Sequence, residues 1–125
     1  MERKYLLTSF GYAIVGLLLG IYMAASKNHS QFVTHAHIML LGFVVSFIYA
    51  VAYKLWVGNA PSKLSNIQFY FHQIGTLSLV AGLFLMFANV VSENMLGPIL
   101  GVSSVLVFVG VVLMKIQLIK ATKKS

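Results

Sequence analysis

Four long apolar runs decide what this chain can fold into. The runs are residues 5–25, 32–56, 67–91 and 95–119. Each reaches the ~20 residues that an α-helix needs to cross a bilayer. The charged side chains inside these limits, Lys54 and Lys115, lie near the ends and can extend to the headgroups. We therefore expect residues 1–125 to form one all-α domain, an integral membrane four-helix bundle surrounded by the lipid bilayer.

Charge and composition exclude several classes of protein. The chain has nine Lys and Arg residues, two acidic residues and 59% hydrophobic residues, whereas soluble domains have about 25% charged residues. The net charge of +7 does not predict nucleic-acid binding, because the cations flank the apolar runs and do not gather on one face. The absence of cysteine excludes disulfides, thiolate metal ligands and covalent heme attachment through a C-x-x-C-H motif.

The distribution of cations predicts the orientation. The termini and the loop between the second and third runs carry Arg3, Lys4, Lys54, Lys63, Lys115, Lys120, Lys123 and Lys124. The other two loops carry Lys27 and Glu93. Because cytoplasmic loops are enriched in Lys and Arg, we expect both termini in the cytoplasm and His29 on the outside.

The start of the first apolar run and the residues before the third run carry further sequence signals. The basic start of the first run and the small residues near Ser26 also fit a signal peptide. Its apolar core exceeds the ~7–15 residues of a signal sequence, so we expect a retained helix. Ser65 and Gln68 have the spacing of a capping box at the start of the third helix.

Small residues recur at four-residue spacing in two runs. They are Gly16, Gly20 and Ala24 in the first run, and Gly97 and Gly101 in the fourth. Such residues let membrane helices approach closely. The sequence leaves open whether they pack inside one bundle or against a neighbouring copy.

Two histidines at the start of the second run are the first candidate ligands. If residues 34–53 form an α-helix, His35 shares a stripe with Met39, Gly42, Ser46, Tyr49 and Tyr53. His37 then points about 200° away, since successive residues turn by about 100°. The two imidazoles therefore cannot bind one metal from a single helix. Ionisable groups in a membrane span are functional candidates by default, so each ring serves a different site or at least one is structural.

His72 and His29 are separate candidates. His72 lies about 20 Å deeper than His35 across a core of about 30 Å, so one chain cannot bind a single heme with both. We expect its ring to hydrogen-bond to Tyr70, Gln73 or a carbonyl, while a second heme or a proton-carrying role stays open. If the second helix began after His37, then His29, His35 and His37 could converge on an outward copper or zinc site.

The segment "VTHAHIML" (33–40) resembles the second helix of the catalytic subunit of heme–copper oxidases and nitric oxide reductases. His35, Ala36 and Met39 match the family's "TAHA…M" pattern, whose histidine is an axial ligand of a low-spin heme. The pair His35 and His37 is similar to a His-x-His pair that binds two different hemes in another helix of that subunit. The segment "FYFHQIG" (69–75) looks like one found in small stand-alone bacterial relatives, although it assigns His72 no ligand role.

The resemblance implies a bacterial inner (cytoplasmic) membrane protein and a homotrimer, because the family's subunit has three four-helix units in a ring. His35 of one copy and His37 of its neighbour would then bind one b-type heme. The methionines Met23 and Met39 are alternative ligands. The chain lacks the family's adjacent His-His pair and its histidine-to-tyrosine copper helix, so an oxygen-reducing centre is not expected and enzymatic activity stays undecided.

These features leave three functions to compare. The first is a heme b protein that transfers electrons to or from a respiratory partner, or that senses heme, oxygen or nitric oxide. The second is a cofactor-free assembly or interaction subunit of a respiratory complex. The third is an outward copper-binding protein that uses His29, His35 and His37.

Overall fold

The chain folds into helices that traverse the molecule repeatedly. The computed structural model describes residues 1–58 and 62–123, and this part of the chain contains helices and loops but no strand. The elements are α1 (Glu2–Ser26), α2 (Phe32–His37), η1 (Ile38–Val45), α3 (Ser46–Ala52), η2 (Tyr53–Val57), α4 (Lys63–Phe87) and α5 (Glu93–Thr122). Because α2, η1, α3 and η2 follow one another without a break, they make one rod, which we call the second span.

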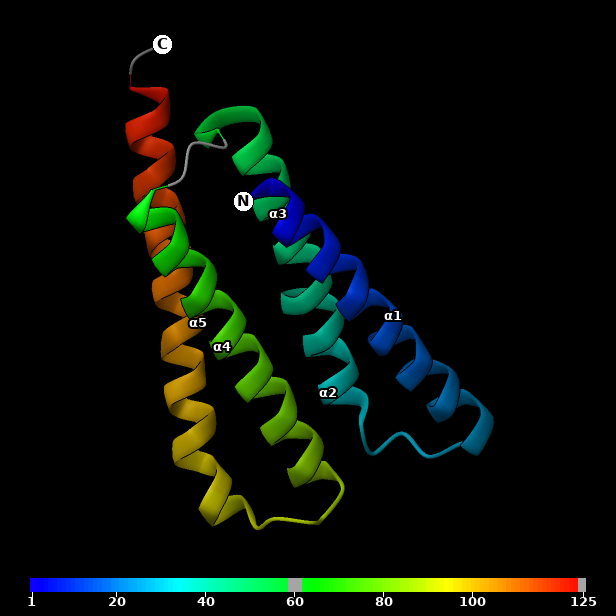
Figure 1. Cartoon of the computed structure of the whole chain (residues 1–125). Coiled ribbons are helices and arrows are strands. Elements are labelled where there is room, and N and C mark those ends of the chain that lie inside the picture. Colours follow the sequence, from blue (N-terminus) through cyan, green and yellow to red (C-terminus); the bar gives the residue numbers. More distant parts are fainter. Residues whose placement is uncertain (59–61, 124–125) are drawn as a thin grey trace.

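The described residues form four spans that are long and apolar enough to cross a membrane. The prediction of an all-α chain with four helical spans is therefore confirmed, and the structure indicates a multi-pass membrane protein. The spans pair as two antiparallel hairpins, α1 with the second span and α4 with α5. Figure 1 shows that α1 begins and α5 ends at one end of the molecule, where the second span also ends and α4 begins.

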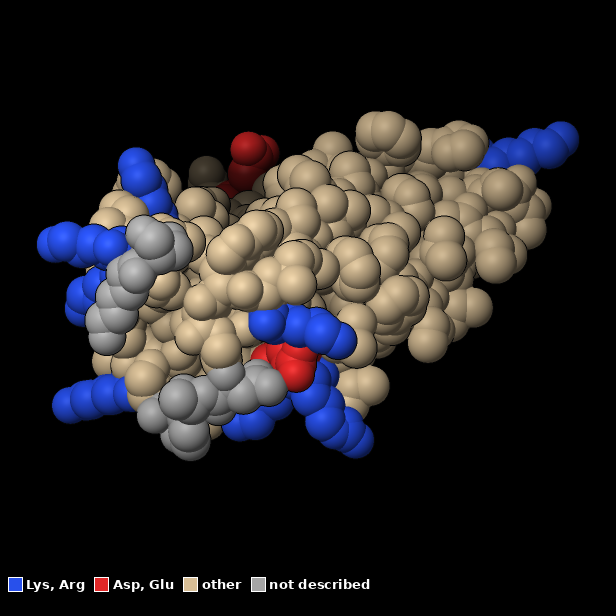
Figure 2. All heavy atoms as spheres, turned by 90° about the horizontal axis from the view of Figure 1, so that it is seen from above, with Lys and Arg blue, Asp and Glu red and all other residues tan. Residues whose placement is uncertain are grey.

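The cations gather at the end that carries the termini. Figure 2 views the molecule from this end, and most of the described Lys and Arg side chains surround it. We call it the basic end, and the end with the loops 27–31 and 88–92 the loop end. Lys27 and Glu93 lie at the loop end.

The third span begins and ends four residues earlier than predicted. The hydroxyl of Ser62 accepts the backbone N–H of Ser65 at 3.0 Å, so Ser62 is the N-cap of α4. The predicted capping box at Ser65 and Gln68 is wrong, because α4 begins at Lys63 and Ser65 already lies inside its first turn. At the other end Asn89 takes a positive φ of 59° and closes a Schellman motif, which stops the helix at Phe87.

The second span departs from a regular α-helix. η1 and η2 are π-helical, with hydrogen bonds from each residue to the fifth before it. Each π turn therefore holds about one residue more than an α turn. At the end of η1 the hydroxyl of Ser46 donates to the carbonyl of Leu41 at 3.2 Å, and this side chain belongs to the site described below.

The bundle is apolar outside and polar inside. Large apolar side chains cover the exterior, and Ile21 and Phe108 are 65% and 67% exposed. Gln68, His72 and Thr76, in contrast, are completely buried on α4. Polar side chains in membrane proteins face the bundle interior because hydrocarbon offers them no hydrogen bonds. The pattern agrees with spans that are surrounded by lipid.

Candidate functional site

His35 packs against α1 at the loop end of the first hairpin. Its Nδ1 lies 2.8 Å from the carbonyl oxygen of Gly16. Its ring covers Gly20, where an added Cβ would lie 3.1 Å from the ring atom Cε1. Gly16 and Gly20 thus form a seam within one chain. The sequence alone also allowed these two glycines to pack against a neighbouring copy.

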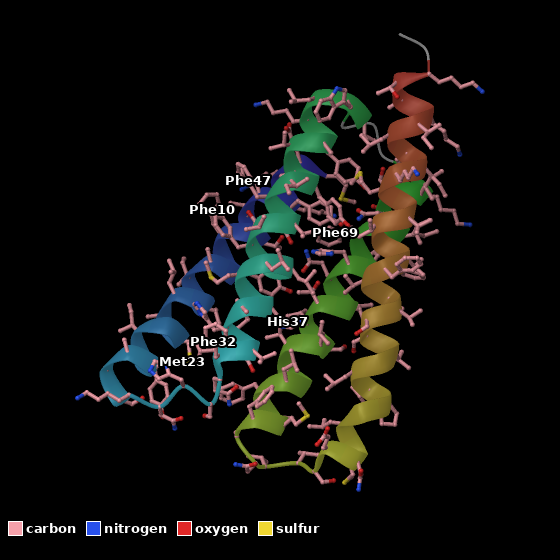
Figure 3. All side chains as sticks on the ribbon, turned by 180° about the vertical axis from the view of Figure 1, so that it is seen from behind. Phe10, Met23, Phe32, His37, Phe47 and Phe69 are labelled. Carbon is pink, nitrogen blue, oxygen red and sulfur yellow. The ribbon has the colours of Figure 1, made fainter. Side chains whose placement is uncertain are left out.

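His37 lies on the same short helix but has a different partner. Its Nδ1 lies 2.8 Å from the carbonyl oxygen of Val33, one turn back in α2. Figure 3 shows His37 on the second span, in the half of the molecule nearer the loop end. The divergence of the two imidazoles that the periodicity predicts is confirmed, since His35 bonds to α1 and His37 to its own helix.

The hydrogen bonds of these two rings define which tautomer the neutral imidazole adopts. A carbonyl oxygen can only accept, so Nδ1 of His35 and of His37 each carries the proton. In the neutral ring Nε2 then keeps a free lone pair. Neither Nε2 has a hydrogen-bond partner among the described residues, and neither belongs to the fully buried unpartnered atoms. A neutral imidazole whose N–H is held by a carbonyl is the form that binds a metal through its other nitrogen.

One chain alone does not assemble a metal site from these histidines. Within residues 1–58 and 62–123, no three His, Cys, Asp or Glu side chains are placed to hold a metal ion. The copper alternative requires an extended segment through His37, whereas α2 begins at Phe32 and both of its histidines are helical. His29 lies exposed in the preceding loop. The condition for the copper site is therefore not met.

The methionines named as alternative ligands pack inside the first hairpin. An added Cβ on Gly16 would lie 2.5 Å from Sδ of Met39, so this thioether lies against the backbone of α1. Met23 is 5% exposed. Both side chains fill the α1 interface, which is the usual role of methionine at helical spacing.

The clefts of the molecule lie elsewhere. A cleft of about 580 Å³ opens between the two loops of the loop end, and Leu19, Gln31 and Phe84 contribute to its lining. A second cleft, of about 490 Å³, lies between α1 and α4 beside Tyr12 and Gln73. Neither is lined by a described histidine. These two clefts therefore offer no pocket for a planar group bound by His35 or His37.

His72 belongs to a different site, between the two hairpins. It is completely buried, and its Nε2 lies 2.8 Å from Oγ of Ser46 in the second span. Its ring contacts the rings of Tyr49 and Tyr5 at centroid distances of 5.0 and 5.8 Å. The expected hydrogen bond within the bundle is present, but the partner is Ser46 and not Tyr70 or Gln73. α5 supports this placement, because Gly110 lies against the backbone of His72.

A separate hydrogen-bonded network lies between His72 and the basic end, and Tyr5, which contacts the His72 ring, belongs to it. Oε1 of Gln68 accepts the hydroxyls of both Tyr5 and Tyr53, the latter at 3.0 Å. Nε2 of Gln117 donates to the Tyr53 hydroxyl at 3.0 Å, and its Oε1 accepts from Ser65 at 2.6 Å. The network joins all four spans, so it fixes how the two hairpins dock.

The sequence contains a signal for this network that the prediction did not use. Along α4 the polar residues Ser65, Gln68, His72 and Thr76 recur every three or four positions within an apolar run. This spacing places them on one helix face. In a membrane helix such a polar face must turn toward other helices.

Comparisons with protein families, with curated proteins and with solved structures find no match for this chain. The resemblance to heme–copper oxidases is thus a resemblance of short segments. What the protein does has to be inferred from the geometry of its own residues.

Proposed function

We propose that this chain is a b-type heme protein of the bacterial inner membrane, and that it binds heme between neighbouring copies through His35 and His37. The observation that carries the proposal is the state of the two rings: each Nδ1 is held by a backbone carbonyl, which leaves Nε2 free to bind iron. The motif resemblance of residues 33–40 supports the same assignment.

A site between copies follows from the divergence of the rings. One chain offers each heme a single histidine, so a six-coordinate iron needs a second ligand from another copy. The surface beside His37 suits such a contact, because Phe32 is 61% and Leu40 55% exposed and both are apolar. A homotrimer would let His35 of each copy meet His37 of the next and complete three equivalent sites.

Two histidine ligands suit electron transfer or sensing better than catalysis. Iron with two axial imidazoles has no open position for a substrate. Bound heme would supply a one-electron carrier, while the chain itself holds and orients the two imidazoles. The proposed orientation has the basic end in the cytoplasm, according to the positive-inside rule. The heme would then lie near the outer face, where it could exchange electrons with a respiratory partner.

The test is a visible spectrum of the full chain purified from cells that are supplied with heme precursor. We expect a sharp Soret band, with separate α and β bands on reduction. His35→Ala and His37→Ala should each abolish six-coordination, because each removes one of the two ligands. His29→Ala is the matched control, since His29 lies in an exposed loop, and it should leave the spectrum unchanged.

Three outcomes would overturn the proposal in different ways. A colourless wild-type protein from heme-replete cells would refute heme binding and favour the cofactor-free assembly role. A monomeric native mass with one six-coordinate heme per chain would refute the site between copies. A six-coordinate spectrum that survives His37→Ala would remove His37 from the ligand set.

A further inference from the structure

The face of the bundle between α1 and α4 is open. α1 packs chiefly on the second span and α4 on α5, and both α1 and α4 run from the basic end to the loop end (Figure 1). Two clefts of about 490 and 420 Å³ lie between them and have four lining residues in common, Val15, Ile38, Leu77 and Val80. The smaller one shares Leu19 and Phe84 with the cleft of about 580 Å³ at the loop end. We call these three adjoining clefts the α1–α4 groove.

The middle of the α1–α4 groove is apolar and faces the bilayer. Val15 on α1 and Leu77 on α4 line it, and each is 56% exposed. Thr34 contributes a hydroxyl to the lining, and this hydroxyl donates to Oε1 of Gln31 at 2.7 Å. The hydrocarbon core of a bilayer contains no water that could fill such a space. The occupant of the middle of the groove is therefore an apolar chain.

The length of the apolar part matches one leaflet of the bilayer. Toward the basic end, hydrogen bonds bridge α1 and α4: the Tyr12 hydroxyl donates to Oε1 of Gln73, and Nε2 of Gln73 donates to Oγ1 of Thr8, each at 3.2 Å. From Leu77, one turn beyond this bridge, to Phe87 at the loop end, α4 rises by about 15 Å. This is half of the ~30 Å hydrocarbon core. The groove thus accommodates one acyl chain from the leaflet at the loop end.

The loop end of the groove is polar but uncharged. Asn28, Ser30, Gln31 and Asn89 contribute amides and hydroxyls to the lining of the 580 Å³ cleft. Gln31 is 5% exposed, and its Nε2 donates to the carbonyl of Phe84 at 3.0 Å, which holds the loop 27–31 against α4. Among the described residues, none that lines this cleft carries a charge. Amide N–H and hydroxyl groups can donate to the oxygens of a phosphate.

A carboxylate lies next to these neutral groups. A further cleft, of about 570 Å³, shares Phe87 and Asn89 with the loop-end cleft, and its lining includes Glu93. Lys27, the basic residue of the loop 27–31, lines neither of the two clefts. A lipid headgroup at this point meets neutral donors and then a negative charge. Glu93 repels an anionic headgroup and attracts an ammonium group.

We propose that the α1–α4 groove binds one phospholipid whose headgroup is zwitterionic and ends in a primary ammonium, as in phosphatidylethanolamine. One acyl chain lies between α1 and α4, the phosphate accepts from the amides of Asn28 and Asn89, and the ammonium pairs with Glu93. A primary ammonium has three N–H donors for a carboxylate, whereas the quaternary ammonium of a choline headgroup has none. The lipid site uses neither His35 nor His37, so it is independent of heme binding.

Native mass spectrometry of the full chain tests the headgroup. The protein is delipidated in dodecyl maltoside and offered an equimolar mixture of dioleoyl phosphatidylethanolamine, phosphatidylcholine and phosphatidylglycerol. We expect one phosphatidylethanolamine per chain, in excess over the other two lipids. Glu93→Gln should lower the ratio of bound phosphatidylethanolamine to phosphatidylglycerol about 2–5-fold, as expected for an exposed ion pair. Glu2→Gln makes the same charge change at the basic end, so it is the matched control and should leave the ratio unchanged.

A second pair of variants tests the groove. Val15→Trp fills the apolar part with an indole ring, and lipid retention should be lost. Val105→Trp is the matched control, because Val105 is exposed on α5 and lines none of the three clefts.

Equal retention of the three lipids, or a preference for either of the other two, would refute the headgroup assignment. Lipid retention by Val15→Trp as strong as by the wild type would refute the groove. A folded wild type that binds no lipid, or that holds detergent in its place, would overturn the whole proposal. If Val15→Trp does not fold, the competition on the wild type decides alone.

Discussion

A close contact between the two helices of the first hairpin gives a quantitative prediction. Gly42 of η1 lies under Tyr12 of α1, and a Cβ added to Gly42 would lie 2.5 Å from Cγ and 2.7 Å from Cβ of that tyrosine. Carbon atoms pack best at about 3.5–4.0 Å, so Gly42→Ala must separate the helices by about 1 Å. The clashing atoms are at the root of the Tyr12 side chain, which cannot rotate away.

The expected cost of Gly42→Ala is about 1–3 kcal/mol, as for other overpacked cores. Gly101→Ala is the matched control, because a Cβ at Gly101 of α5 meets nothing within 4 Å. The gain in helix propensity, about 1 kcal/mol from Gly to Ala, is common to both variants. The difference between them therefore isolates the contact with Tyr12.

Thermal unfolding in dodecyl maltoside, followed by far-UV circular dichroism, measures this difference. A change of 1 kcal/mol shifts the Tm of a chain of this size by about 4 °C, so Gly42→Ala should melt about 4–12 °C below Gly101→Ala. The substitution Tyr12→Ala in the Gly42→Ala background should reduce the gap, because the two residues are in contact. Equal Tm values for the two glycine variants would refute the packing of α1 on η1.

Two further predictions concern the network and the orientation. Gln68→Leu should lower the Tm more than Tyr5→Phe. The first change leaves the buried hydroxyls of Tyr5 and Tyr53 without their side-chain acceptor, at about 1–3 kcal/mol each, whereas Tyr5→Phe removes only one hydrogen bond. Equal shifts of the Tm would contradict the shared acceptor. The chain has no cysteine, so Ser30→Cys and Lys63→Cys can be labelled separately with a membrane-impermeant maleimide in intact cells. We expect reaction at position 30 only, and the reverse result would invert the proposed orientation.

The fold was largely predictable, because apolar runs of bilayer length leave few alternatives. The differences between the predicted and the observed helices have local causes. The start of α4 was misplaced because Ser62 and Ser65 are both acceptable caps, and the choice between them depends on the burial of Ser65 and Gln68. The π turns of the second span were not foreseen, since no residue pattern distinguishes them from α turns.

The directions in which the candidate histidines point could be predicted from the sequence, but their hydrogen-bond partners could not. Helical periodicity was sufficient to show that His35 and His37 diverge. Which carbonyl holds each Nδ1 depends on how closely α1 approaches at Gly16, and this is a property of the packed hairpin. Ser46 could not be assigned to His72 for the same reason, because the two residues meet only when the hairpins dock.

The polar interface between the hairpins has a consequence for biosynthesis. Each hairpin can enter the bilayer as a unit, since its own backbone bonds are complete within its helices. Until the second hairpin arrives, Tyr5 and Tyr53 face lipid without the glutamines that they later bond. Docking then gains hydrogen bonds that lipid cannot supply. The first hairpin alone would therefore hold two phenol hydroxyls in the bilayer without the side-chain partners that the second hairpin supplies.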